Sequence, residues 1–510
     1  MVNFLNNKNF FKIFFFFFIL TLSFILFRGR LGSDDLEVFN FIFNWNHFEG
    51  SFIEFKRDLY LNKRNFVDDA QLHSGYTLYH RLPWVIQTGI IYYTTQTLLL
   101  LFDTENYFLI QYLSGYILTF YFVISFFLFS KILNEKGLNK NQSIFVSILI
   151  FFGTGLICLT TGQYIESMAV FLSLLYIRSS KSFYKFIFAL LITLIKPFYI
   201  LVIFALKVDI LDNKNFYFNK HNFFKLREIF IVIFVYFACI LAVTDVNNIL
   251  NYFQTQSPTK IQSEYINNFF NFYFSIGAGI LFTNLIPILL IFYGFSEKTF
   301  LKILPIIILS FILSFWEGFH GGVPGVRYIL PFLIIFYEEY IKAFKKIVNQ
   351  KKFIVIIIFL LTILNLPTLE FRNFAISEYE NATVRSFKPT GPAKLDSKNM
   401  NYIYYKWPVK SIAFNHLFFS NYVLFSKMIN KETIKINGIT IELKNIYPQT
   451  GLGRLIYIKR NNIDIPYPKL KIFINRFYEF FVFVYTGLIF LFFIYFYRNL
   501  KYIFDFDEKD

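Results

Sequence analysis

The chain has 510 residues, of which 56% are hydrophobic, and its mean hydropathy is +0.48. A soluble domain cannot bury that much apolar surface, so the composition predicts an integral membrane protein. The formal net charge is +17, but the basic residues are scattered between apolar segments and form no single patch, which argues against nucleic-acid binding.

Apolar segments follow one another along most of the chain. The first, 10–27, predicts an uncleaved span, because no small-residue cleavage site follows it. The later segments are 107–130, 142–159, 163–177, 228–244, 276–293, 300–316, 326–342, 353–368 and 477–497. Segment 83–102 either spans or lies in the interface, and segment 184–206 is broken at Lys196-Pro197, which predicts two half-spans. We therefore expect an all-α polytopic membrane protein with about 11–13 transmembrane helices.

The short connectors predict an orientation. If the N-terminus is cytoplasmic, every short loop rich in Lys and Arg is cytoplasmic too, whereas the loops at 160–163 and 317–325 contain neither residue. This pattern predicts a multi-pass protein of the plasma (inner) membrane, with both termini in the cytoplasm. Segments 28–106, 245–275 and 369–476 would then lie on the outer, periplasmic side.

Three parts follow from this layout. Residues 1–368 form a transmembrane module that includes the first outer loop at 28–106, where juxtamembrane helices are expected. Residues 369–476 form a small α+β outer domain, since two alternating runs at 433–436 and 439–442 flank Asn437-Gly438 and predict a β-hairpin. Residues 477–510 are the last transmembrane helix and a cytoplasmic tail.

The first chemically suggestive motif follows the first span. Asp34 and Asp35 are adjacent carboxylates beside an apolar segment, where an acidic group is costly unless it is used or paired. Such a carboxylate can accept a proton from a hydroxyl nucleophile. The alternative is a helix N-cap in which Glu37 completes a capping box. Both interpretations remain open, because one aspartate can cap the helix while the other acts as the proton acceptor.

Two further motifs lie in the middle of the chain. Gln163 and Glu166 are about one helical turn apart, so they can share a face that lines a polar cavity or can be ordinary interfacial residues. Lys196 precedes Pro197 inside an apolar segment. The lysine either meets a phosphate at this break or extends its side chain to the interface.

A glycine-rich segment, 316–328, separates two apolar segments and ends at Arg327 and Tyr328. Glycines permit close approach of the backbone to a ligand, and an arginine can pair bidentately with a phosphate. Arg81 is a second candidate of this kind. The alternatives are a flexible connector and a solvated arginine. The histidines, His320 among them, fit no metal-ligand spacing, and a structural or substrate-binding role is preferred.

In their order and sidedness these motifs resemble the GT-C superfamily of membrane glycosyltransferases, including bacterial mannosyltransferases and the aminoarabinose transferase of lipid A. The family has an acidic pair soon after the first span, matched here by Asp34 and Asp35, and juxtamembrane helices similar to 38–48 and 83–102. Lys196-Pro197 and 321–328 are similar to its later motifs. The resemblance covers residues 10–345 in layout. The Trp-Trp-Asp motif of oligosaccharyltransferases is absent, which argues against a peptide-sequon acceptor.

The resemblance implies transfer of a sugar, with inversion, from a polyprenyl-phosphate-linked donor to a lipid, glycan or protein acceptor at the outer face of the membrane. Asp34 or Asp35 would be the general base, and Arg327, Lys196 and Arg81 would bind the donor phosphate. The residues implied in substrate binding are Glu37, Gln163, Glu166, Glu317, His320 and Tyr328. No cofactor is required, and a divalent ion on the aspartate pair remains open. The expected partners are donor, acceptor and membrane lipid.

Three other functions compete with this one. A lipid-linked polysaccharide polymerase or ligase shares the layout and donor type but transfers a glycan. A lipid or solute transporter predicts paired broken helices and charges deep within the spans. A non-enzymatic assembly scaffold would need none of the candidate residues for chemistry.

Overall fold

A computed structural model describes part of the chain, and nearly all of that part is helical. The described residues are 42, 82–100, 120–156, 166–208, 220–243, 265–274, 279–314, 328–350, 353–362, 422, 425, 426, 429, 431–436, 439–442, 497 and 503.

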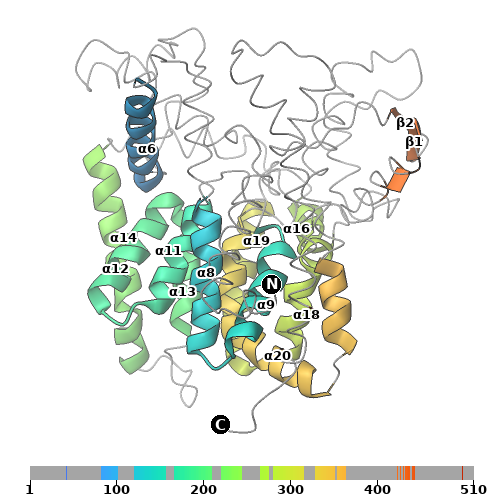
Figure 1. Cartoon of the computed structure of the whole chain (residues 1–510). Coiled ribbons are helices and arrows are strands. Elements are labelled where there is room, and N and C mark those ends of the chain that lie inside the picture. Colours follow the sequence, from blue (N-terminus) through green and yellow to red (C-terminus); the bar gives the residue numbers. More distant parts are fainter. Residues whose placement is uncertain are drawn as a thin grey trace, which may run out of the picture.

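The longer described helices pack side by side as a bundle (Figure 1). They are α8 (Phe120–Glu135), α9 (Lys140–Phe152), α11 (Glu166–Arg178), α12 (Ser182–Ile195), α13 (Ile200–Lys207), α14 (Lys220–Val243), α16 (Tyr265–Phe274), α18 (Leu285–Tyr293), α19 (Glu297–Ser314) and α20 (Tyr337–Gln350). A short helix, α17 (Ile280–Thr283), precedes α18, and residues 353–362 are also helical.

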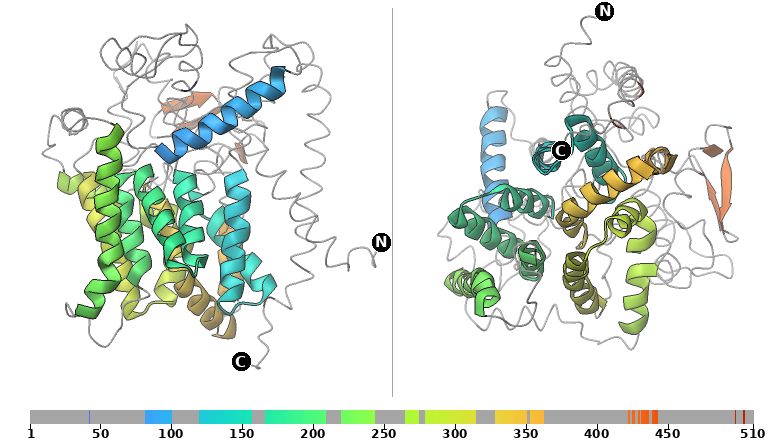
Figure 2. Two further views of the ribbon diagram at one scale, coloured as in Figure 1. Left: turned by 90° about the vertical axis from the view of Figure 1, so that its left-hand side faces the viewer. Right: turned by 90° about the horizontal axis from the view of Figure 1, so that it is seen from below.

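Neighbouring helices in the bundle are linked by direct packing. Helix α11 packs between α8 and α12, while α12 and α13 both pack on α14. Helix α19 joins α13 to α16, and α18 packs on α20. Helix α6 (Leu82–Leu100) contacts α12 and lies across one end of the bundle, as the left view of Figure 2 shows. This arrangement brings the ends of α11, α12 and α13 together, and the polar groups of interest lie at those ends.

The middle of the bundle is occupied by η4 (Leu330–Phe336), a 3₁₀ helix whose seven residues are all buried. It packs against α11, α13, α19 and α20. Runs of 3₁₀ helix longer than three or four residues are uncommon, because their hydrogen-bond geometry is poorer than that of an α-helix. Here the segment LPFLIIF is apolar on every side, so burial on all sides stabilises it in spite of that geometry.

Segment 184–206 is broken where the sequence predicts. Helix α12 ends at Ile195, Lys196 is extended with φ −151° and ψ 131°, and a short 3₁₀ turn, η1 (Pro197–Tyr199), leads into α13. The residue before a proline is disfavoured in the α region, so the helix stops one residue before Pro197. The prediction of a break at Lys196-Pro197 is therefore confirmed.

The predicted β-hairpin is also present. Strands β1 (Thr433–Ile436) and β2 (Ile439–Glu442) pair antiparallel, with Ile436 opposite Ile439 across Asn437-Gly438. Asn-Gly favours the tight turns that join two strands in this way. These are the strands found in the part of the chain that the structure describes.

The predicted polytopic membrane fold, and with it the predicted multi-pass placement in the plasma membrane, is wrong for the described residues. Of their helices, none is both long enough and apolar enough to cross a bilayer. Most are well short of the ~20 residues that a crossing requires. Helix α19 carries Glu297, Lys298 and Lys302, and the apolar part of α14, 229–243, follows the charged residues Arg227 and Glu228.

Candidate functional site

Lys196 is the centre of the candidate site, and its position follows from the break between α12 and α13. Its extended backbone ends one helix, and its carbonyl accepts a hydrogen bond from the Tyr199 N–H at 2.9 Å. The residue is only 8% exposed. A lysine ammonium is rarely buried without a partner, since removing it from water is costly.

The partner is Glu166, the first residue of α11. Its Oε1 accepts a hydrogen bond from Lys196 Nζ at 2.6 Å, and its side chain is fully buried. A carboxylate in the first turn also interacts favourably with the positive end of the helix dipole. The helix start and the helix break are thus joined by a charge-assisted hydrogen bond of the short, strong kind.

Aromatic rings cover the ammonium group. Lys196 Nζ lies 4.3 Å from the centre of the Tyr328 ring and 5.9 Å from that of Phe198. The two rings pack edge to face, with centroids 5.6 Å apart and planes at 82°. A cation over a ring face is attracted by the negative face of the ring, so Tyr328 stabilises the ammonium in place. Glu166, Lys196, Phe198 and Tyr328 are referred to below as the Lys196 cluster.

Members of three separate sequence motifs meet in this cluster. Glu166 comes from the motif that follows residues 160–163, Lys196 from the Lys-Pro break, and Tyr328 from the end of the glycine-rich segment. The remaining predicted residues lie outside the described part of the chain, and their roles stay predictions; they are Asp34, Asp35, Glu37, Arg81, Gln163, Glu317, His320 and Arg327.

The side chains of the Lys196 cluster are suited to binding an anion. A lysine ammonium donates several N–H groups and, in a site with little water, interacts strongly with a phosphate or carboxylate. Glu166 and the two rings restrict where the ammonium can move, so the charge is held in one place before any ligand arrives. A group held in this way stabilises a developing negative charge without reorganising.

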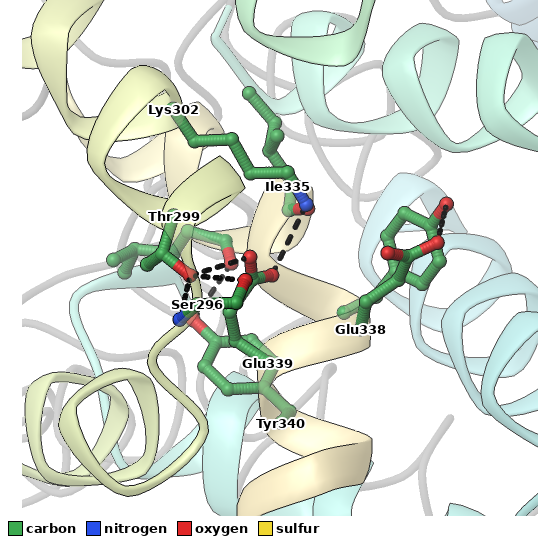
Figure 3. A network of polar contacts seen from close by, with 9 residues as sticks. Ser296, Thr299, Lys302, Ile335, Glu338, Glu339 and Tyr340 are labelled. Atoms are coloured by element: carbon green, nitrogen blue, oxygen red, sulfur yellow. Dashed lines mark hydrogen bonds and ion pairs between the residues drawn. The ribbon is translucent and has the colours of Figure 1, made fainter. Parts of the chain in front are cut away.

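A second buried ion pair was missed from the sequence (Figure 3). Lys302 Nζ of α19 donates to Glu339 Oε2 of α20 at 3.1 Å, and the two side chains are 0% and 1% exposed. Thr299 donates to the other oxygen of Glu339 at 3.1 Å, and the Ile335 carbonyl lies 3.5 Å from Lys302 Nζ. The position of Lys302 within the apolar run Phe300-Leu301-Lys302-Ile303-Leu304 was the available signal for an unusual lysine.

The Lys302–Glu339 pair and the Lys196 cluster differ in their surroundings. Both oxygens of the Glu339 carboxylate accept hydrogen bonds from α19, and Lys302 also contacts the Ile335 carbonyl of η4, so this network joins α19 to α20 and η4. The Lys196 cluster instead lies where a helix begins, a helix breaks and a turn ends, and its motif neighbours in the chain include Gln163 and Arg327. We therefore take the Lys196 cluster as the candidate functional site.

Neither a metal site in the described residues nor a similar known protein gives further information about the candidate site. Among the described residues, no three of the His, Cys, Asp and Glu side chains are grouped so that they could hold a metal ion. Comparison of the chain with protein-family models, with curated proteins and with solved structures gives no match.

Proposed function

We propose that this protein is a glycosyltransferase that moves a sugar from a polyprenyl-phosphate-linked donor to a lipid, glycan or protein acceptor, with inversion. One observation carries the proposal. Lys196 contacts both Glu166 and Tyr328, and the three residues come from three distant motifs that resemble those of the GT-C superfamily. Their proximity supports the proposal that the three motifs contribute to one site.

In the proposed reaction, a hydroxyl oxygen of the acceptor attacks the anomeric carbon of the donor. The bond from that carbon to the phosphate oxygen breaks, and the phosphate leaves with the electron pair. Asp34 or Asp35 accepts the hydroxyl proton as general base. Lys196 offsets the negative charge that grows on the leaving phosphate, and Glu166 and Tyr328 hold its ammonium in position.

The test is consumption of a soluble short-chain polyprenyl-phosphate mannose or polyprenyl-phosphate aminoarabinose by the purified protein, with lipid and glycan extracts as acceptors. Release of polyprenyl phosphate is followed by mass spectrometry. We expect Lys196→Gln to lower kcat/KM about a hundredfold, because it removes a fixed positive charge from the leaving group. Tyr328→Leu removes the ring but no charge, and we expect a loss of about fivefold.

Lys302→Gln is the matched control. It removes another buried lysine that also pairs with a glutamate and lies over a tyrosine ring, but in another part of the fold. We expect it to lower the free energy of unfolding by about 3–5 kcal/mol while the folded fraction keeps its kcat/KM. The proposal fails if the wild-type protein consumes neither donor, or if folded Lys196→Gln, Asp34→Asn and Asp35→Asn proteins all transfer sugar at the wild-type rate.

A further inference from the structure

A second polar cluster lies at the opposite ends of the helices that build the Lys196 cluster. Tyr176 is in the last turn of α11, Lys185 in the first turn of α12, Lys207 at the end of α13, and Glu228 in α14. Helices α11 to α14 stand next to one another in Figure 1. Lys185 and Lys196 are separated by the length of α12, roughly 16 Å, so the two clusters are distinct.

These four residues, which we call the Lys185 cluster, form two contacting pairs that the charge of Glu228 links. Lys207 Nζ donates a hydrogen bond to Glu228 Oε2. Lys185 Nζ lies 5.6 Å from the centre of the Tyr176 ring. The negative charge of Glu228 reaches both sites, since it acts on Tyr176 as well as on Lys185. Four helices therefore bring two ammonium groups, one carboxylate and one phenol to one place.

Positive charge is in excess at this place. Burial lowers the pKa of Lys185, and the nearby Lys207 and Lys136 lower it further, while Glu228 opposes them. Lys207 and Lys136 are thus close enough to Lys185 to repel it, and Glu228 offsets part of that repulsion. Lys136 is exposed and Lys185 is half-buried, so this edge of the cluster lies near the protein surface. An anion bound here would relieve the repulsion between the lysines.

Two buried polar atoms of the cluster have no hydrogen-bond partner among the described residues. They are the Tyr176 hydroxyl and Glu228 Oε1. The phenol can donate a hydrogen bond, whereas the carboxylate oxygen can only accept one. Because unsatisfied buried polar atoms are costly, a ligand that supplies both an acceptor and a donor would be favoured.

We propose that the Lys185 cluster binds a phosphate group that carries one proton. Its oxygens would accept hydrogen bonds from Lys185 and from the Tyr176 hydroxyl, and its P–OH would donate to Glu228 Oε1. Sulfate has the same shape but no proton at neutral pH, so a carboxylate repels it. The cluster therefore distinguishes phosphate from sulfate by hydrogen-bond chemistry, and the inference does not depend on sugar transfer.

Calorimetric titration of the purified full-length protein with inorganic phosphate, hexyl phosphate and sulfate, at constant ionic strength, tests the proposal. We expect the phosphates to bind at least about tenfold more tightly than sulfate, because one hydrogen bond to a charged group is gained and one repulsion avoided. Tighter binding of inorganic phosphate identifies a free anion as the ligand. Tighter binding of hexyl phosphate identifies the headgroup of a phosphorylated lipid.

Variants locate the binding to the cluster. Lys185→Gln should weaken phosphate binding about tenfold or more, and Tyr176→Phe, which keeps the ring, several-fold. Lys131→Gln is the control, because Lys131 is an exposed lysine of α8 that pairs with Glu135 at 3.9 Å. It should leave phosphate binding unchanged. Equal affinities for phosphate and sulfate, no phosphate binding, or wild-type binding by both Lys185→Gln and Tyr176→Phe would overturn the proposal.

Discussion

Gly294 marks a close approach between two helices of the bundle. It ends α18, and a Cβ atom at this position would lie 2.0 Å from the backbone oxygen of Glu339 in α20. Backbone atoms cannot move aside as a flexible side chain can. We expect Gly294→Ala to lower the free energy of unfolding by about 3 kcal/mol, the upper end of typical overpacking effects, as measured by urea denaturation.

Gly89 provides the matched control for this substitution. It lies inside α6, and an added Cβ would meet only the Ile42 side chain at 3.8 Å, an ordinary van der Waals contact. Alanine is a better helix former than glycine, so Gly89→Ala should raise stability by about 0.5–1 kcal/mol. Equal effects of the two substitutions would mean that α18 does not end against α20 as described.

Individual residues also mark the limit of what the sequence can predict. The helix break at Lys196 could be predicted, because the residue before a proline is disfavoured in the α region, and that rule needs only the two adjacent residues. The pairing of Lys196 with Glu166 could not be predicted, because the two residues are 30 positions apart and no periodicity relates them. The same holds for Lys302 and Glu339, which are 37 positions apart.

At the scale of elements, the break between α12 and α13 depends on Pro197. Without the proline, Lys196 is free to adopt helical dihedral angles, and α12 can continue past Ile195. Each added helical residue turns by about 100° and would carry the lysine away from Glu166. We expect Pro197→Ala to raise the rate at which an amine-reactive reagent labels Lys196 roughly tenfold, since burial now protects it.

Labelling at each lysine is read by mass spectrometry. Pro305→Ala is the control, because Pro305 lies inside α19 rather than at the break. It should leave the labelling of Lys196 unchanged. If both variants label Lys196 as slowly as the wild type does, the proline does not determine the position of the lysine.

The elements themselves were predictable to different degrees. The β-hairpin and the break in segment 184–206 were found because Asn-Gly and X-Pro act on adjacent residues. The 3₁₀ conformation of η4 could not be predicted. An uninterrupted apolar run such as LPFLIIF has no hydrophobic periodicity that would distinguish one helix type from another. Its conformation depends on the four helices that pack around it.

At the scale of the whole molecule, the prediction of membrane spans was wrong for the described residues, because hydropathy measures the apolar content of a segment and not whether other helices cover it. Phe126, for example, is fully buried and contacts the rings of Phe151 and Phe152, with centroids 5.8 and 6.0 Å away. Contacts of this kind join the buried residues of the bundle into one large hydrophobic cluster. In the described helices, much of the apolar surface is therefore covered by other helices.

Tyrosines that are wholly or partly buried in this bundle should make its stability fall at alkaline pH. Burial raises the pKa of Tyr121 to about 12, and it also raises the pKa of Tyr273 and Tyr340. An unfolded tyrosine loses its proton near pH 10, whereas the folded one keeps it. The raised pKa therefore contributes stability that is fully present below pH 10 and is lost as the pH rises through about 12.

Tyr121→Phe isolates the contribution of one such group. Between pH 10 and 11, the free energy of unfolding of the variant should fall less steeply than that of the wild type, by up to about 1.4 kcal/mol per pH unit, the value for one proton. Phe145→Leu is the control, because it removes a buried ring that packs against Phe344 and Phe359, with centroids 5.8 and 5.7 Å away, but no titrating group. That protein should be less stable at every pH with an unchanged slope. A slope for Tyr121→Phe equal to that of the wild type would show that the phenol ionises as readily in the folded bundle as in the unfolded chain, and that α6 and α8 do not enclose it.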